Sequence, residues 1–221
     1  MIDTPDNAFQ LVADLLVAAG TFGIGMMLWF AGEYVLHRFA MHHLHGKGMM
    51  SREHLEHHVH STWRFSYTHL LSWTGVIVVG AAIWFPVGWL ISGVATGVLL
   101  AAGWAGGYAF YEYQHARAHL VPPRGRYGRW VRRHHFHHHF GRPMSNHGVS
   151  MPLWDHVFGT HESPERIRVP RRLALPWMLD EHGQLLDEFT ADYELVGNDR
   201  LDERQAGIDR ARAFASQAPT D

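Results

Sequence analysis

Three long apolar stretches constrain the fold of this chain more than any other feature. They cover about residues 9–31, 69–85 and 87–112, and the first holds a single charge, Asp14, near its start. A helix needs about 20 apolar residues to cross the hydrocarbon core, so the first and third are long enough and the second is short. They lack a polar face, which disfavours the alternative of three buried helices in a soluble protein. We therefore expect an all-α fold built on integral membrane helices.

The connections between these stretches predict the topology. Pro86 and Gly88 separate the second from the third, so we expect a tight hairpin between two membrane helices there. Every Lys and Arg lies within 38–64 or 117–212, and positively charged loops stay cytoplasmic. We therefore expect the N-terminus outside and residues 31–68 and 111–221 together in the cytoplasm. The expected membrane is the bacterial inner membrane, or the endoplasmic reticulum if the source is eukaryotic.

Histidine is the chemically unusual residue of the chain. There are 20 histidines and no cysteine, and all the histidines but one lie between His37 and His161. The absence of cysteine excludes disulfides, thiolate zinc sites and iron–sulfur clusters, and it leaves imidazole and carboxylate as metal ligands. The net charge of −2 gives no support for bulk nucleic-acid binding.

The spacing of the histidines predicts metal binding. Three pairs lie four residues apart, which places both members on one helix face with Cβ atoms about 5–6 Å apart. Such a pair can bind one metal ion at about 2.0–2.1 Å. His37 and His42 are five apart, about 140° around a regular α-helix, so we expect them to bind two different metal ions. The three pairs are His54 with His58, His115 with His119 and His135 with His139.

We interpret ten histidines as metal ligands, and because one metal takes about four to six ligands, ten predict two metals. One pair alone is more often solvated or buried, and the run at 134–139 resembles a nonspecific metal-binding tract. Four groups in one cytoplasmic layer favour a metal site instead. The ten are His37, His42, His54, His57, His58, His115, His119, His135, His138 and His139.

Two acidic residues are candidates for supporting these ligands. A metal-bound imidazole usually donates its other N–H to a carboxylate, a carbonyl or water. Glu33 and Glu112 lie at the ends of the first and third apolar stretches, where a carboxylate is costly unless it is paired. We therefore expect both to accept hydrogen bonds from ligand imidazoles.

The complete set of motifs resembles the fatty acid hydroxylase/sterol desaturase superfamily. The motifs are His-x4-His at 37–42, His-x2-His-His at 54–58, His-x3-His at 115–119 and His-x2-His-His at 135–139. The segments Glu33-Tyr34 to Phe39 and Trp154-Asp155 to Thr160 are similar to the fatty acid 2-hydroxylase branch. The resemblance covers about residues 28–160.

This resemblance implies a membrane-bound non-haem di-iron oxygenase that hydroxylates a fatty acyl or sphingolipid chain. It implies two metal ions, iron by expectation although zinc can replace it in purified protein, with O₂ as co-substrate. It also implies a separate electron donor, either cytochrome b5-like or a ferredoxin with its reductase. The family's ligands fall on the ten histidines, and the resemblance adds His134, His147 and Asp155 to the supporting candidates.

Other functions remain open at this point. Within the superfamily, the alternatives are a carotenoid hydroxylase and a sterol or lipid desaturase. The non-enzyme alternative is a metal-binding or transport protein of the membrane. Transport predicts ionisable residues within the spans, yet residues 9–30, 70–85 and 87–110 contain only Asp14.

We expect two parts along the chain. Residues 1–161 would form the membrane hydroxylase domain, whose cytosolic helical cap holds the histidine layer at 37–60 and 115–161. Residues 162–221 would form a polar cytosolic tail without evident chemistry, with a charged helix at 201–217. The basic run from Arg124 to Arg133 is expected to attract anionic lipid headgroups. The sharper alternative is that Arg132 and Arg133 dock an acidic electron donor.

Overall fold

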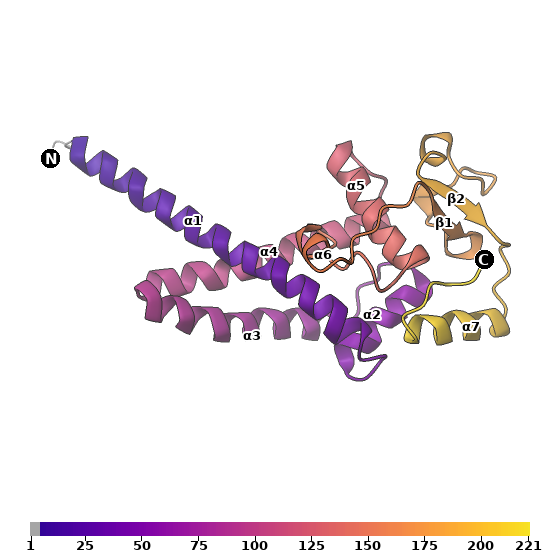
Figure 1. Ribbon diagram of the computed structural model, residues 1–221, viewed down its shortest axis with the longest axis horizontal. Helices are drawn as coiled ribbons and strands as arrows, with labels where there is room; N and C mark the ends of the chain where they lie inside the picture. The colour runs from indigo at the N-terminus through magenta and orange to yellow at the C-terminus, as the bar shows by residue number, and fades with distance from the viewer. Residues whose placement is uncertain (1–4) are drawn as a thin grey trace. The chain divides into compact units, whose positions relative to one another are not determined.

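The computed structural model describes residues 5–221, so residues 1–4 of the expected membrane domain lie outside the described part (Figure 1). Its long elements are helices. α1 (Pro5–Val35), α3 (Tyr67–Ser92) and α4 (Val94–Leu120) are long and apolar enough to cross a membrane. The expected all-α membrane fold is therefore confirmed. The chain divides into two compact units: the first comprises residues up to Gly32 and Trp73–Phe110, and the second comprises Glu33–Ser72 and Tyr111–Asp221.

The break between α3 and α4 differs from the prediction. α3 continues through Pro86 and Gly88 to Ser92, and the chain turns at Gly93, whose φ is +89°. A membrane helix tolerates an internal proline where its neighbours satisfy the freed carbonyl, whereas glycine adopts a positive φ without steric cost. The bounds 69–85 and 87–112 were therefore wrong. The second span has 26 residues and is not short.

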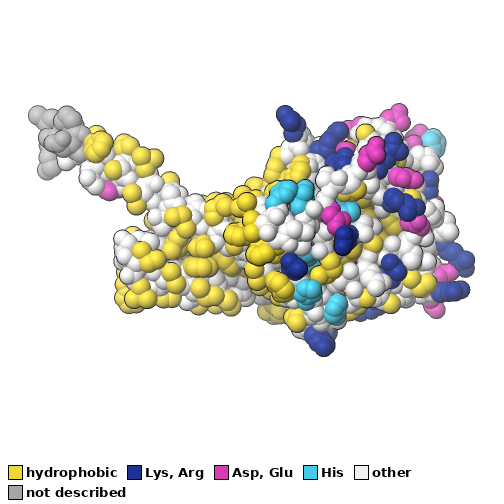
Figure 2. Space-filling model, in the orientation of Figure 1, with side chains coloured by type: hydrophobic (Ala, Val, Ile, Leu, Met, Phe, Trp, Pro, Cys, Tyr) yellow, Lys and Arg dark blue, Asp and Glu magenta, His cyan; other side chains and the backbone are white. Residues whose placement is uncertain are grey.

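Close helix contacts hold the first unit together. The Trp104 indole packs edge-on against Trp29 with ring centroids 5.1 Å apart, and its Nε1 donates to the Val76 carbonyl at 3.2 Å. A Cβ added at Gly25 would lie 2.8 Å from the Cα of Gly103, so this contact requires glycine. Small residues at such crossings let helix backbones approach in lipid. Hydrophobic side chains cover the visible face of α3 and α4 (Figure 2).

The second unit carries many of its histidines on short helices, whereas His115 and His119 lie in the last turns of α4. The first part of the unit contains a π-helical turn (Leu36–His42), α2 (Met49–His60), α5 (Gly125–Phe136), a second π-helical turn (His137–Gly141) and α6 (Leu153–Val157). A charged helix, α7 (Glu203–Phe214), confirms the one predicted within 201–217. The short 3₁₀ helices are Arg171–Leu173, Pro176–Met178 and Asp187–Phe189.

The C-terminal segment also contains a small sheet that the sequence analysis did not anticipate. β1 (Ile167–Pro170) pairs in parallel with β2 (Tyr193–Val196), with Ile167 opposite Tyr193. The four-residue strands are too short to show a clear alternation of apolar and polar residues, which is the main strand signal in a sequence.

The C-terminal segment packs against the helices that carry the histidines. α7 lies against α2, with an ion pair between Arg210 and Glu56 (Figure 1). On α5, Arg133 pairs with Asp192 at 2.5 Å. Within the segment, a buried ion pair between Arg172 and Asp209 ties α7 to the residues that follow β1. The segment is therefore part of the second compact unit rather than a separate appendix.

The glycine contact between α1 and α4 generates a stability prediction. We expect Gly25→Leu to destabilise the protein by about 1–3 kcal/mol, because overpacking a close contact forces the helices apart. The matched control is Gly23→Leu, since a Cβ at Gly23 meets no atom within 4 Å. Thermal unfolding in detergent measures both variants. Equal unfolding midpoints for the two variants would contradict the assigned contact.

Candidate metal centre

The structure brings the ten patterned histidines together in two groups of five. Within each group, one nitrogen from every imidazole lies within 4.8 Å of the others, and the rings are largely buried. The first group is His37, His42, His54, His58 and His138, and the second is His57, His115, His119, His135 and His139.

His57 and His138 each belong to a different group from the i, i+4 histidine pair beside them in the sequence. The pair His54 and His58 belongs to the first group, but the intervening His57 belongs to the second. The pair His135 and His139 shows the reverse, because His138 belongs to the first group. Each His-x2-His-His motif therefore contributes to both groups and fixes the distance between them.

His37 and His42 lie in the same group, which corrects the expectation that they bind different metals. The 140° separation assumed a regular α-helix. The chain instead forms a π-helical turn over Leu36–His42, and π-helices close i→i+5 hydrogen bonds. Residues five apart then share a face, so both imidazoles point to one centre.

Backbone carbonyls fix the protonation of the ligand rings. His37 Nδ1 lies 2.6 Å from the His147 carbonyl oxygen, and His138 Nδ1 lies 2.7 Å from that of Ser145. In the second group, His57 Nδ1 lies 3.0 Å from the Thr62 carbonyl oxygen, and His119 Nδ1 lies 2.9 Å from that of Ser61. A carbonyl only accepts, so each Nδ1 must carry the proton of the neutral ring. Each Nε2 is thereby left with a bare lone pair.

The Nε2 atoms of the first group form a regular figure. The Nε2 atoms of His54 and His138 each lie 2.9–3.1 Å from the Nε2 atoms of the other three rings. The rings of His54 and His138 are themselves far apart, with centroids at 6.1 Å. The five nitrogens thus lie at the corners of a trigonal bipyramid, with those of His54 and His138 at the two apices. Nitrogens about 3.0 Å apart would suit metal–nitrogen bonds of about 2.1 Å, so the residues fit a bound metal ion.

The second group has a similar arrangement. His57 Nε2 lies 3.0 Å from that of His115 and 3.1 Å from that of His119, which is 2.9 Å from that of His135. The rings of His57 and His135 are the distant pair, with centroids at 6.4 Å. Both ring nitrogens of His139 are buried with no hydrogen-bond partner among the described residues. A metal ion bound at one of these nitrogens would satisfy it.

Burial keeps these rings neutral. Burial, the largest cause, lowers the pKa of His57 from 6.5 to about 4. It also lowers the pKa of the other ligand rings on α2, α5 and the second π-helical turn: His54, His58, His135, His138 and His139. The rings of both groups that lie on these elements are therefore neutral at pH 7, with one nitrogen free of a proton, which is the form that binds a metal ion.

Asp155 supports the first group indirectly. Its carboxylate accepts from the backbone N–H groups of His147 and Gly148, both at 2.8 Å, and from the Thr160 hydroxyl at 2.7 Å. Although burial opposes ionisation, the nearby His134 and His147 side chains and these hydrogen bonds hold the pKa of Asp155 well below its usual value. Asp155 thus fixes the loop whose His147 carbonyl orients His37.

The other supporting candidates have different places. Glu33 is buried and accepts from the Ser150 N–H at 3.0 Å instead of from an imidazole, and Glu112 lies half-buried in α4. His134 and His147 are buried with a ring nitrogen 3.5 Å and 3.7 Å from the Asp155 carboxylate. We expected carboxylates to hold the ligand rings. Backbone carbonyls do so because the chain at 61–62 and 145–147 runs beside them.

Sequence reasoning missed the residues that orient the rings. The carbonyls of Ser61, Thr62 and Ser145 leave no signal in a sequence, since every residue has one. Ser216 was also missed. Its hydroxyl donates to the His42 carbonyl at 3.2 Å, which leaves the oxygen free to accept from His42 Nδ1, also at 3.2 Å. A serine 77 residues beyond the last histidine motif carries no recognisable pattern.

The two arginines proposed to dock an electron donor serve internal contacts. Arg132 is buried and donates to the carbonyls of Arg117, Val121, Pro122 and Gly128. Arg133 pairs with Asp192 and donates to the Pro164 carbonyl at 2.8 Å. Neither guanidinium is available as a docking charge, so this part of the prediction was wrong.

Known proteins match the region that holds both groups. A model of the fatty acid hydroxylase family matches residues 22–160, more than half of the chain and all ten histidines. The chain is 30% identical to the fatty acid 2-hydroxylase of Rattus norvegicus over 156 residues, which are 69% of this chain and 42% of that protein. It is 28% identical to a dihydroceramide fatty acyl 2-hydroxylase of Arabidopsis thaliana, with 62% and 58% covered.

A further relative is the ceramide very long chain fatty acid hydroxylase of Saccharomyces cerevisiae, at 28% identity over 68% of this chain and 40% of that protein. The chain thus spans only about two fifths to three fifths of the relatives' lengths. No solved structure matches the chain. The extent of the family match, together with the motifs it contains, shows that the chain belongs to the fatty acid hydroxylase family.

Proposed function

We propose that this protein hydroxylates the acyl chain of a lipid, using two metal ions, O₂ and electrons from an external donor. The observation that supports this most strongly is the pair of five-nitrogen groups, each with its lone pairs directed to one centre. The relatives named fatty acid and ceramide hydroxylases supply the reaction and the class of substrate.

The proposed metal is iron. Imidazole ligands suit iron, copper and zinc, so the nitrogen set alone does not select one. Zinc has no redox chemistry and so cannot support a hydroxylation, and between iron and copper the family resemblance implies iron. When bound, the metal pair would supply the oxidation chemistry with O₂. The protein's part is to position the ions, keep the ligand rings neutral and shield the centre from water.

A cavity beside the second group provides a route for substrate. It has a volume of about 460 Å³ and includes His57 in its lining. Its other walls come from α2 and from residues 62–69, which lead into α3. Because α3 is a candidate membrane span, an acyl chain could enter from the bilayer beside it. We propose that the oxidised carbon lies next to the acyl carbonyl, as the names of the 2-hydroxylase relatives indicate.

We propose that the metal centre faces the cytoplasm. The ligands lie at or beyond the ends of candidate spans that are joined to the arginine-rich parts of the chain, and positively charged segments stay inside. A cytoplasmic donor, cytochrome b5-like or a ferredoxin with its reductase, would then have access to the centre.

Lipid analysis tests the reaction. We expect cells that express the protein to gain one oxygen atom on the acyl chains of one lipid class, next to the carbonyl. His138→Ala should abolish this gain, because His138 bridges the ligands of the first group. Mass spectrometry of total lipid measures both. A loss of two hydrogens in place of a gained oxygen would instead indicate a desaturase, and an unchanged lipidome in cells that supply a donor would contradict the proposal.

Metal content tests the ligand assignment without relying on activity. We expect the wild-type protein to retain two metal ions after dialysis and His138→Ala to retain one, because only the first group loses a ligand. The matched control is His60→Ala, which removes an exposed histidine of the same histidine-rich helix α2. Elemental analysis by mass spectrometry gives the stoichiometry. Retention of both ions by His138→Ala, or an equal loss in His60→Ala, would refute the assignment.

Ser216 provides a test of ring orientation. We expect Ser216→Gly to weaken metal binding at the first group by about 10–100-fold, the usual effect of losing an outer contact. The φ of Ser216 is +52°, which glycine adopts freely, so the backbone should stay folded. Ser216→Asn should restore binding, because asparagine tolerates this conformation and offers an acceptor oxygen. Zinc titration against a chromophoric chelator measures the affinity, and a wild-type affinity in Ser216→Gly would show that the hydroxyl does not position His42.

A further inference from the structure

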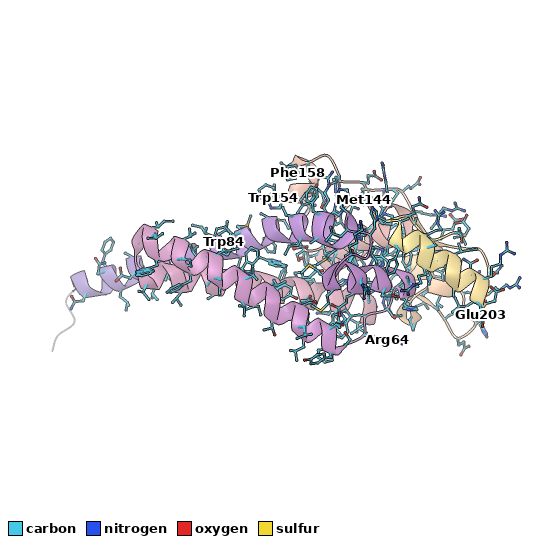
Figure 3. The ribbon with its side chains drawn as sticks, turned by 90° about the horizontal axis from the view of Figure 1, so that it is seen from below. Arg64, Trp84, Met144, Trp154, Phe158 and Glu203 are labelled. Atoms are coloured by element: carbon cyan, nitrogen blue, oxygen red, sulfur yellow. The ribbon has the colours of Figure 1, made fainter. Side chains whose placement is uncertain are left out.

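α6 and the residue after it expose an unusual amount of apolar surface. Leu153 is 43% exposed, Val157 60% and Phe158 54%. The rings of Trp154 and Phe158 stack with centroids 6.1 Å apart, and both side chains project at the edge of the molecule (Figure 3). Soluble surfaces carry scattered apolar residues, whereas neighbouring ones mark a contact with a partner or a membrane.

The position of this surface relates it to the first membrane span. Phe158 stacks on Tyr34 with ring centroids 5.0 Å apart, and the Tyr34 hydroxyl lies 3.1 Å from that of Thr160. Tyr34 belongs to the last turn of α1, just beyond the apolar stretch at residues 9–31. One turn later, Arg38 donates to the Tyr34 hydroxyl at 2.6 Å. Tyrosine and arginine at a span end are typical of the membrane–water interface, so α6 is held at the depth of the headgroups.

Positive charge flanks the same surface. The Tyr127 hydroxyl donates to the Ser150 carbonyl at 3.0 Å and so ties the start of α5 to the loop before α6. Arg124 and Arg126 precede Tyr127 and are exposed. Within residues 5–221, neither forms an ion pair, whereas Arg129 and Arg133 both lie beside Asp192. Two free guanidinium groups beside an apolar surface are complementary to lipid phosphates.

We propose that α6 and Phe158 insert into the headgroup region of an anionic phospholipid bilayer, with Arg124 and Arg126 facing the phosphates. The opposite side of α6 carries Asp155, which accepts a hydrogen bond from the backbone N–H of His147. The membrane-bound helix would thus also hold the loop that orients His37. This inference rests on the membrane fold and not on the proposed reaction.

Single-cysteine labelling tests the proposal, because the natural chain contains no cysteine. The full chain carries Phe158→Cys, labelled with a polarity-sensitive fluorophore, in vesicles of phosphatidylcholine with phosphatidylglycerol. The matched control is Leu201→Cys, an exposed apolar site at 64% near the start of α7. We expect the probe at position 158 to emit at shorter wavelength and to be quenched several-fold more by shallow spin-labelled lipid.

Three outcomes would overturn the proposal. Equal quenching at the two positions would place α6 in water. A blue-shifted probe that lipid-bound spin labels do not quench would indicate a protein partner instead of lipid. Equal quenching at position 158 with and without phosphatidylglycerol would show that the insertion of α6 does not depend on anionic lipid. Phosphatidylglycerol should increase the quenching of the probe at position 158. We expect Arg124→Gln combined with Arg126→Gln to abolish this increase in quenching, and an unchanged increase would exclude a role for these two arginines.

Discussion

The second unit is organised around imidazole Nε2 atoms whose lone pairs face one another with no proton between them. In the first group, Nε2 atoms approach to 2.9–3.1 Å. The carbonyls of His147 and Ser145 hold the ring protons of His37 and His138 on the opposite nitrogens, so these contacts are not hydrogen bonds between the two rings. Buried acceptors that face each other are destabilising unless a cation lies among them. The arrangement therefore suits a bound metal ion, and the loops that present the carbonyls are as important as the rings themselves.

Segments from much of the chain contribute to this arrangement. α1 passes directly into the π-helical turn that carries His37 and His42, and α4 ends with His115 and His119. The candidate ligands thus follow the candidate membrane spans along the chain without a flexible linker. The C-terminal segment contributes a hydrogen bond from the Trp177 indole to the His119 carbonyl at 3.1 Å. Because Ser216 also contacts His42, the C-terminal segment makes polar contacts with a residue of each group.

The sequence predicted well what depends on pattern and composition. Apolar length indicated the three spans, and the i, i+4 rule correctly paired histidines such as His54 with His58. Prediction from the sequence failed where the local geometry departs from a regular α-helix. The π-helical turn placed His37 and His42 in one group, and Gly93 rather than Pro86 ended α3. Contacts made by backbone carbonyls, and by a distant serine, could not be predicted because they follow from the path of the chain.

Locating the bound ions directly tests the central claim that the two five-nitrogen groups are metal sites. Crystals of the protein purified without chelator would be measured at the absorption edge of the metal. The account predicts two anomalous peaks, one surrounded by the Nε2 atoms of the first group and one by those of the second. A single peak, or peaks bound by other residues while these ten rings stay free of metal, would contradict it.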